Sequence, residues 1–202
     1  MLCLHAIPAR ALDVLKSLMA CSACDRFDLG GGTALALHLG HRISIDLDLF
    51  TKEAFDPEEL LAALPQVGSR EVLGTAGNSL NLRLNDVKVD FLRHAYPRLR
   101  PARAEDGIRL LDIPDIAAMK LSTATNRGAR KDFFDLAALL EIHELPRLLD
   151  WYADKFPNYD LFPVIRSLTW FVDAEEEPDP LLLSSLRWEE VKERLTRAVA
   201  AL

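Results

Sequence analysis

Hydrophobic and polar residues alternate strictly in "SIDLDLF", residues 44–50, which predicts a strand with one buried face. Successive side chains of a strand point to opposite faces. Asp46 and Asp48 are therefore expected to share the polar face, roughly 6.5–7 Å apart at the backbone by the rise of a strand. The expected buried face carries Ile45, Leu47 and Leu49.

A β-hairpin is predicted further along the chain. Leucines alternate with polar residues in "NSLNLRL", residues 78–84, and a second alternating run, "VKVDFL", covers residues 87–92. Asn85–Asp86 between them is typical of a two-residue turn. Asp90 falls on the polar face of the second strand, together with Lys88. If this strand lies beside residues 44–50, Asp90 joins the two earlier aspartates.

Glycines separate a short apolar strand, "RFDLG", from a short helix, "TALALHLG". We expect the strand to end at Gly30, Thr33 to cap the helix and Gly40 to end it. Glycine is unfavourable in regular structure. At the start of a helix, however, the N–H groups of Gly31 and Gly32 could approach a phosphate closely, because no Cβ intervenes.

Two further helices are predicted in this half of the chain. The first covers residues 8–22 and starts at Pro8. The second is "DPEELLAAL", with Asp56 as its N-cap and Pro57 at its first position. An additional strand is expected around "EVLG". The N-terminal half therefore mixes helices and strands.

The pattern changes to a helical period in the C-terminal half. A Pro- and Arg-rich passage and a possible short strand, "GIRLLDI", come first. The predicted helices then cover residues 115–126, 131–142, 145–156 and 160–173. The last helix carries one apolar face, formed by Trp188, Val191, Leu195, Val199 and Leu202. We predict an α+β fold with a mixed core over residues 1–112 and a helical half over residues 113–202.

Composition narrows the class of protein. The 202 residues are 50% hydrophobic, enough for one domain or two small ones. The net charge of −7 disfavours a general nucleic-acid binder, although residues 93–131 hold nine Lys and Arg against four Asp and Glu. No uncharged apolar run reaches the roughly 18 residues of a membrane helix, and no signal peptide is recognised. We expect a cytoplasmic protein.

Cysteine, histidine and serine provide no catalytic arrangement. The chain has 3 cysteines and 5 histidines, scattered without metal-ligand spacing. Cys21 and Cys24 form an isolated C-x-x-C pair, which we interpret as a partly buried helix end. Zinc, cysteine and serine hydrolase chemistry is therefore disfavoured.

Three converging carboxylates predict a cation. Asp46, Asp48 and Asp90 would repel one another unless a cation lay between them. Oxygen ligands of this kind suit Mg²⁺. Two Mg²⁺ ions could hold the attacking and leaving oxygens of a phosphoryl transfer. The glycine loop would then bind the phosphates of an NTP, and the aspartates its magnesium.

This combination resembles the nucleotidyltransferase superfamily, whose members share a G-G-[ST] loop, a D-x-D strand and a third strand carboxylate. Residues 31–50 resemble more narrowly the AbiEii/AbiGii-type abortive-infection toxins, with the pattern G-G-T-x-L…G-x-R-x-S-x-D-x-D-[LF]-F. The matching residues are Gly31, Gly32, Thr33, Leu35, Gly40, Arg42, Ser44, Asp46, Asp48 and Phe50. The resemblance extends over about residues 27–140.

The resemblance also implies functional residues in the helical half. Lys120, on a predicted helix, would reach triphosphate oxygens; the alternative is a lysine extending along an apolar surface to solvent. Asp132 and Asp135 would orient Lys120 or act as a base on the acceptor hydroxyl. The alternative for these two is an ordinary helical ion pair of Asp135 with Lys131. Arg42 and Ser44 would either contact phosphate or hold the loop in shape.

The activity implied by the resemblance is Mg²⁺-dependent transfer of a nucleotide from an NTP to an acceptor. In related toxins the acceptor is RNA, at the 3′ end of tRNA, and a paired antitoxin protein is implied as well. Two alternatives stay open. The acceptor could be a hydroxyl of a small molecule or of a protein, or the chain could be a nucleotide-binding module without activity.

Overall fold

The computed structural model describes residues 1–202, and the chain packs as two compact units. The first unit contains Met1–Tyr96 and Pro101–Asp112. The second contains Pro97–Arg100 and Ile113–Leu202. The short segment Pro97–Arg100 therefore belongs to the second unit, although the chain on both sides of it belongs to the first.

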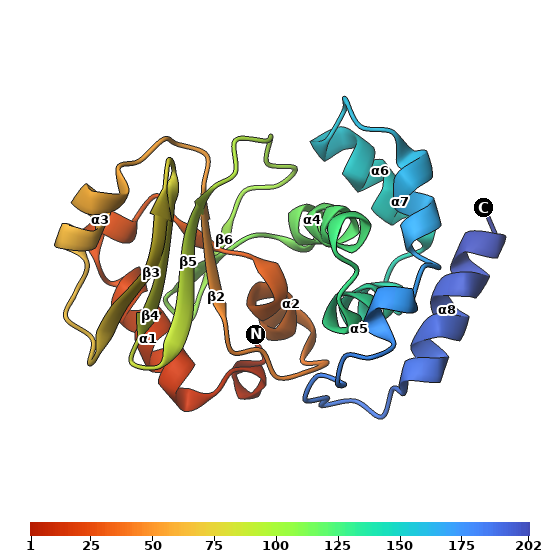
Figure 1. Cartoon of the computed structure of the whole chain (residues 1–202), viewed down its shortest axis with the longest axis horizontal. Helices are drawn as coiled ribbons and strands as arrows, with labels where there is room; N and C mark the ends of the chain where they lie inside the picture. The colour runs from red at the N-terminus through yellow and green to blue at the C-terminus, as the bar shows by residue number, and fades with distance from the viewer. The chain divides into compact units, whose positions relative to one another are not determined.

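The first unit is built on one seven-stranded mixed sheet with the strand order β3-β4-β5-β2-β1-β7-β6 (Figure 1). Strands β2 and β5 pair in parallel, as do β1 and β7, whereas the other neighbouring strands are antiparallel. The strands are β1 (Asp28–Leu29), β2 (Leu47–Thr51), β3 (Arg70–Ala76), β4 (Ser79–Leu84), β5 (Val87–Arg93), β6 (Arg103–Glu105) and β7 (Ile108–Leu110). The predicted α+β fold is confirmed.

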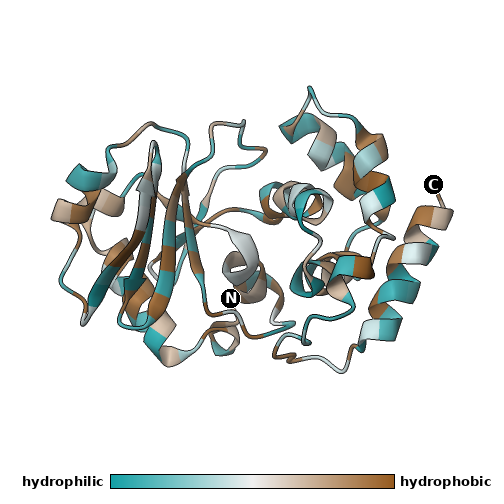
Figure 2. Cartoon of the chain, in the orientation of Figure 1, coloured by the Kyte–Doolittle hydropathy of each residue, from teal (hydrophilic) through white to brown (hydrophobic).

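The predicted hairpin is present as β4 and β5. Asn85 and Asp86 both adopt positive φ, 47° and 63°, as a two-residue hairpin turn requires. Apolar and polar residues alternate along both strands (Figure 2), so that Leu80, Leu82 and Phe91 are fully buried. The alternation seen in the sequence thus correctly identified the buried face of this hairpin.

Three helices complete the first unit: α1 (Ala9–Met19), α2 (Gly31–Leu39) and α3 (Pro57–Ala63). Helix α1 packs against β5 and β7, and α3 against β4. Asp56 caps α3 as predicted, since its carboxylate accepts hydrogen bonds from the N–H groups of Glu58 and Glu59. Helix α2 ends at Gly40, whose φ of 65° is the left-handed conformation that favours glycine.

The strand predicted over residues 44–50 was partly wrong. Strand β2 begins only at Leu47, and Ile45 is 57% exposed instead of buried. Tertiary contacts hold the preceding segment away from the sheet. The N–H of Ser44 donates to the carbonyl of Ala6 at 2.9 Å, and the Thr33 hydroxyl donates to the carbonyl of Asp46.

The same contacts explain why Thr33 is not a helix cap. Helix α2 begins two residues earlier than predicted, with Gly30 at the N-cap position. Other boundaries shift as well. Helix α1 starts after Pro8 and ends at Met19, and a short 3-10 helix follows. Strand β6 was not predicted, because it is short and lies in the Pro- and Arg-rich passage.

The second unit is helical. Its helices are α4 (Ile113–Asn126), α5 (Arg130–Leu139), α6 (Leu145–Lys155), α7 (Leu161–Ser167) and α8 (Trp188–Ala200). Helix α4 contacts α5, α6 and α7, and α5 contacts α8. The helix predicted over 160–173 is shorter in the structure, where α7 ends at Ser167 and a 3-10 turn occupies Val172–Ala174. Trp188, Val191 and Leu195 of α8 are buried as predicted, but Leu202 is 56% exposed.

A buried ion pair attaches Pro97–Arg100 to the second unit. The ammonium of Lys155 lies 2.6 Å from a carboxylate oxygen of Asp115 and donates to the carbonyl of Pro97 at 2.9 Å. The carboxylate of Asp115 also accepts from the N–H groups of Leu99 and Arg100, at 3.0–3.1 Å and 3.0 Å. Both charged side chains are almost completely buried, so each requires this partner.

Candidate active site

The parallel pairing of β2 with β5 places Asp48 directly opposite Asp90. Asp46 lies just before β2 begins, on the same segment. Asp46 and Asp48 are partly exposed, whereas Asp90 is 8% exposed. The sheet register, which sequence alone did not give, therefore sets Asp48 beside Asp90, and Asp46 lies two residues before Asp48.

The carboxylate of Asp90 is held by two neighbours. The ammonium of Lys88 lies 2.8 Å from Asp90 Oδ2, and the side-chain amide of Asn81 donates to Asp90 Oδ1 at 2.9 Å. The hydrogen bond to Asp90 raises the pKa of Lys88, and the charges of Asp90, Asp46 and Asp48 raise it further. Lys88 therefore supplies a cation within the protein to one of the three carboxylates, Asp90.

The first turn of α2, whose Gly31 and Gly32 form the glycine loop predicted from the sequence, requires glycine for steric reasons. Gly31 has a φ of 62°, and a Cβ at this position would lie 2.2 Å from Asp48 Oδ2. A Cβ on Gly32 would lie 2.3 Å from Arg42 Nη2. The Asp48 carboxylate and the Arg42 guanidinium therefore lie directly against the backbone of the glycine loop.

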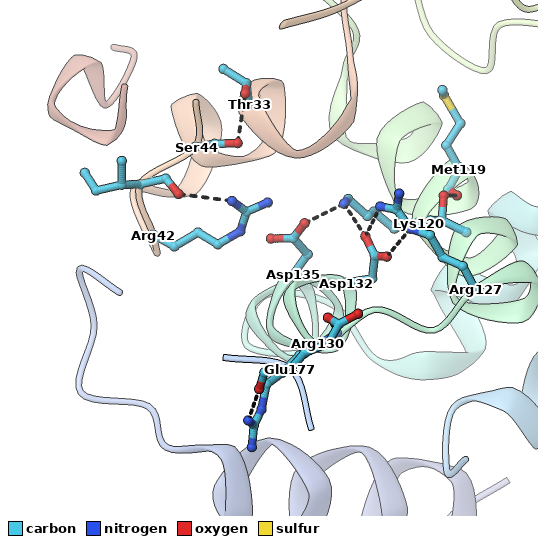
Figure 3. Close-up of polar contacts among 12 residues, drawn as sticks. Thr33, Arg42, Ser44, Met119, Lys120, Arg127, Arg130, Asp132, Asp135 and Glu177 are labelled. Atoms are coloured by element: carbon cyan, nitrogen blue, oxygen red, sulfur yellow. Dashed lines mark hydrogen bonds and ion pairs between the residues drawn. The ribbon is translucent and has the colours of Figure 1, made fainter. Parts of the chain in front are cut away.

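Three further residues predicted to bind the nucleotide, Thr33, Arg42 and Ser44, are buried close to the glycine loop. Thr33, Arg42 and Ser44 are 1%, 3% and 8% exposed. The Thr33 hydroxyl faces that of Ser44 at 2.8 Å, and Arg42 Nη1 donates to the carbonyl of Ile43 at 3.1 Å (Figure 3). These contacts fix the shape of the loop from within.

The second unit contains its own charged cluster. The ammonium of Lys120, on α4, lies 2.8 Å from Asp132 Oδ1 and 2.6 Å from Asp135 Oδ2, both on α5. Arg127 Nε lies 3.1 Å from the other oxygen of Asp132. Figure 3 shows both carboxylates directed at the Lys120 ammonium. Lys120 is 6% exposed and the two aspartates are fully buried, so the solvent-directed lysine considered from sequence is wrong.

Sequence reasoning missed three contributors: Lys88 and Asn81 on either side of Asp90, and Arg127 beside Asp132. A signal existed for Lys88, which shares the polar strand face with Asp90. Asn81 could have been found only from the β4–β5 register, which pairs it with Asp90. Arg130, in contrast, is engaged elsewhere, since it contacts Glu177 and stacks 4.6 Å from the Trp188 ring.

The donor chemistry of Asp46, Asp48 and Asp90 fits a hard divalent cation. All three offer carboxylate oxygens, the ligands that Mg²⁺ prefers. The Lys88 ammonium contacts one of the three, Asp90. As the side chains lie, no three acidic, histidine or cysteine residues converge on one metal position. A cation held by all three aspartates would therefore have to displace Lys88 or Asn81 from Asp90.

The cysteines take no part in this site. Cys3, Cys21 and Cys24 are all free thiols. Burial raises the pKa of the Cys24 thiol to about 12, which keeps it protonated and unreactive at neutral pH. A helix that crosses a membrane needs about 20 apolar residues, and none of the helices has that length and apolarity.

Comparison with known proteins gives the family. A family model described as "Nucleotidyl transferase AbiEii toxin, Type IV TA system" matches residues 13–201. An uncharacterized protein of Aquifex aeolicus (strain VF5) is 33% identical, with 93% of each chain covered.

Solved structures are similar in fold. A putative nucleotidyltransferase from Helicobacter pylori superposes with a TM-score of 0.57 at 20% identity, covering 96% of this chain and 95% of the other. MenT4, a nucleotidyltransferase toxin from Mycobacterium tuberculosis H37Rv, superposes with a TM-score of 0.56 at 16% identity, covering 96% and 86%. The glycine loop, the opposed aspartates and the family match agree, and the chain belongs to the AbiEii family of nucleotidyltransferase toxins of type IV toxin–antitoxin systems.

Proposed function

We propose that this nucleotidyltransferase moves a nucleoside monophosphate from an NTP to RNA, at the 3′ end of tRNA, with Mg²⁺ as cofactor. The observation that carries the proposal is the register that sets Asp48 opposite Asp90, with the backbone of Gly31 against the Asp48 carboxylate. Phosphate-binding loop and carboxylates thereby form one site within the first unit.

The glycine loop is assigned to the triphosphate. The N–H groups of Gly31 and Gly32 begin α2, where the helix dipole attracts negative charge. Thr33, Arg42 and Ser44 are buried, which favours support of the loop over direct phosphate contact. The positive charge of Arg42 against Gly32 adds to the attraction for phosphate.

Asp46, Asp48 and Asp90 would hold the magnesium, in a site for one or two ions. Bound there, Mg²⁺ would offset the charge of the triphosphate and stabilise the negative charge that develops during transfer. Lys88 would then leave Asp90 for another anionic partner.

The reaction is an in-line displacement. An acceptor hydroxyl oxygen forms a bond to the α-phosphorus, and the bond from that phosphorus to the bridging oxygen of the β-phosphate breaks. Pyrophosphate leaves with the electron pair. The hydroxyl proton passes to a carboxylate of the trio and then to solvent, so the acceptor gains a nucleoside monophosphate.

Lys120, Asp132 and Asp135 enter the proposal with the roles that the resemblance implies. The resemblance implies phosphate binding for Lys120 and orientation of its ammonium for the two aspartates. Their distances to the ammonium, 2.8 and 2.6 Å, support this orienting role. Because Asp132 is fully buried between two cations, orientation is favoured over action as a base.

The test is incubation of the purified protein with each α-³²P-labelled NTP, Mg²⁺ and total tRNA. Wild type is expected to label tRNA with one preferred nucleotide. The double variant Asp46→Asn/Asp48→Asn should lose at least about 100-fold in rate, the scale of preorganised electrostatic groups. Asp13→Asn/Asp150→Asn removes the same charge at exposed positions and should retain activity.

Other outcomes would redirect the proposal. Label in a protein or small-molecule fraction, but not in tRNA, would reject the RNA acceptor and keep the nucleotide site. Equal labelling by wild type and the Asp46→Asn/Asp48→Asn variant would reject the carboxylate site itself. Membership of a toxin–antitoxin family also implies an antitoxin partner. We propose that the protein acts in the cytoplasm, where NTP and tRNA occur together.

A further inference from the structure

A pocket of about 540 Å³ lies beside the carboxylates, within the first unit. Its lining residues come from the start of α1, the segment that leads into β2 and the turn that joins β4 to β5. Asp46 and Lys88 line it, and Lys88 connects it to Asp90 through their 2.8 Å contact. Its volume is in the range of small-molecule binding sites.

This pocket is lined by three cations, Arg10, Arg83 and Lys88, and by two carboxylates, Asp46 and Asp86. Arg10 lies 2.7 Å from Asp86, and Arg83 lies 3.4 Å from Glu71. All four of these side chains are at least half exposed, and exposed ion pairs contribute little to stability. Either guanidinium can therefore exchange its acidic partner for a phosphate, to which its geometry is suited.

The pocket also presents an apolar surface. Ile45 lines it and is 57% exposed, because the segment before β2 leaves the sheet. An exposed aliphatic side chain beside three cations offers contact to the face of a base next to contacts for its backbone phosphates. Proteins that bind single-stranded nucleic acid use positively charged grooves that follow its backbone.

The position of the pocket relative to the glycine loop decides what it holds. None of Gly31, Gly32 and Thr33 lines it, whereas Asp46 and Lys88 do. In an in-line displacement the acceptor and the leaving group lie on opposite sides of the phosphorus. If the loop holds the triphosphate, the pocket is on a side of the carboxylates that the donor leaves open.

We propose that this pocket is the acceptor subsite and binds the sugar-phosphate backbone of the 3′ end of a single-stranded RNA. Arg10 and Arg83 contact its phosphates, Ile45 packs against a base, and Lys88 moves between Asp90 and the acceptor strand. The proposal rests on the function proposed above and adds where the acceptor binds.

The test measures binding of a fluorescently labelled single-stranded RNA with a free 3′ hydroxyl, by anisotropy at several salt concentrations and without NTP. Arg10→Gln/Arg83→Gln is expected to bind more weakly than wild type. Its slope of log affinity against log salt should fall by about 1.4, since each phosphate contact on a single strand contributes about 0.7.

The matched control is Arg26→Gln/Arg103→Gln, which removes two other paired arginines of the first unit. Arg26 lies 4.0 Å from Glu53 and Arg103 lies 3.2 Å from Asp112, and neither lines the pocket. This variant should bind RNA as wild type does. Circular dichroism of both variants checks that the fold is kept.

The outcomes separate this inference from the proposed function. In the transfer assay Arg10→Gln/Arg83→Gln should raise KM for RNA, while Mg²⁺–NTP stabilises it against heat as it does wild type. No RNA binding by wild type, unchanged binding by Arg10→Gln/Arg83→Gln, or an equal loss in the control overturns the acceptor subsite. The acceptor subsite is also overturned if Arg10→Gln/Arg83→Gln transfers the nucleotide to a protein or small molecule at the wild-type rate. Absence of Mg²⁺–NTP stabilisation in wild type rejects the nucleotide site instead.

Discussion

The two units each hold a cluster of aspartates with a lysine, and the clusters differ in exposure. In the second unit, Lys120 and Arg127 contact Asp132 and Asp135, and the Lys120 side chain is only 7% exposed. In the first unit, Lys88 contacts Asp90 and its side chain is 49% exposed, and Asp46 and Asp48 are partly exposed as well.

This difference separates two uses of the same chemistry. A buried, balanced cluster is costly to disturb, because removal of one partner leaves an uncompensated charge away from water. A cluster that is open to solvent loses less stability on substitution, because water can solvate a charge that has lost its partner. Stability should therefore depend on the second cluster, and metal binding on the first.

The largest expected effect is on stability, from Lys120→Met. It leaves Asp132 and Asp135 buried without their shared cation and should lower the free energy of unfolding by about 3–5 kcal/mol. Urea denaturation at pH 7 measures it. Lys52→Met, which removes an exposed lysine, should change stability by less than about 0.5 kcal/mol. If Lys120→Met were as stable as wild type, stability would not depend on the second cluster more than on the first.

A smaller loss is expected from Gly31→Ala. The positive φ costs about 1–3 kcal/mol for a residue with a Cβ, and the Cβ would displace the Asp48 carboxylate, 2.2 Å away. Gly107→Ala is the matched control, since Gly107 has a φ of 76° and no atom within 4 Å of its added Cβ. Both variants should lose stability in urea, but only Gly31→Ala should lose thermal stabilisation by Mg²⁺–NTP. If both variants kept the thermal stabilisation by Mg²⁺–NTP, the contact between Gly31 and the Asp48 carboxylate would have no role in nucleotide binding.

Asp48→Asn should change stability less than Gly31→Ala does. The Asp48 carboxylate is partly exposed, so its replacement should change the free energy of unfolding by no more than about 1 kcal/mol when EDTA removes divalent cations. The same exchange of atoms in the second unit, Asp132→Asn, should cost about 3–5 kcal/mol. Urea denaturation of both variants in EDTA gives the comparison. A loss of several kcal/mol in Asp48→Asn would mean that the first cluster is structural as well.

The smallest effect is the pH dependence that comes from Lys88. Its pKa is raised from 10.5, chiefly by the hydrogen bond to Asp90. The contribution to folding is therefore complete below about pH 10.5 and is lost as the pH rises through the raised value. Wild type should lose more stability than Lys88→Gln between pH 10 and 12, and Lys52→Gln should follow wild type. If the free energy of unfolding of wild type and of Lys88→Gln fell equally with pH, the Lys88–Asp90 hydrogen bond would not contribute to stability.

The sequence predicted those features that depend on neighbouring residues. Alternation located β4 and β5, the Asn85–Asp86 turn joined them, and Asp56 capped α3 as expected. These signals are local, since each depends on the period of side chains or on hydrogen bonds within a few residues.

The errors arose where distant residues override local pattern. Ile45 and Leu47 fit the alternating pattern of a strand. The N–H of Ser44, however, donates a hydrogen bond to the carbonyl of Ala6, and Ile45 stays outside the sheet. Threonine is a common N-cap residue, yet the Thr33 hydroxyl contacts the hydroxyl of Ser44 and the carbonyl of Asp46. The burial of Lys120 depends on the approach of α5 to α4, which the sequence does not indicate. Candidate residues could be predicted from motif, but their partners required the fold.

The attachment of Pro97–Arg100 to the second unit has a consequence for how such proteins evolve. The chain passes between units after residues 96, 100 and 112, so exchange of one unit between relatives needs three compatible joints instead of one. Recombination that carried over only residues 113–202 would leave Asp115 and Lys155 without the backbone groups of Pro97, Leu99 and Arg100. Selection should therefore keep the two units together as one inherited block.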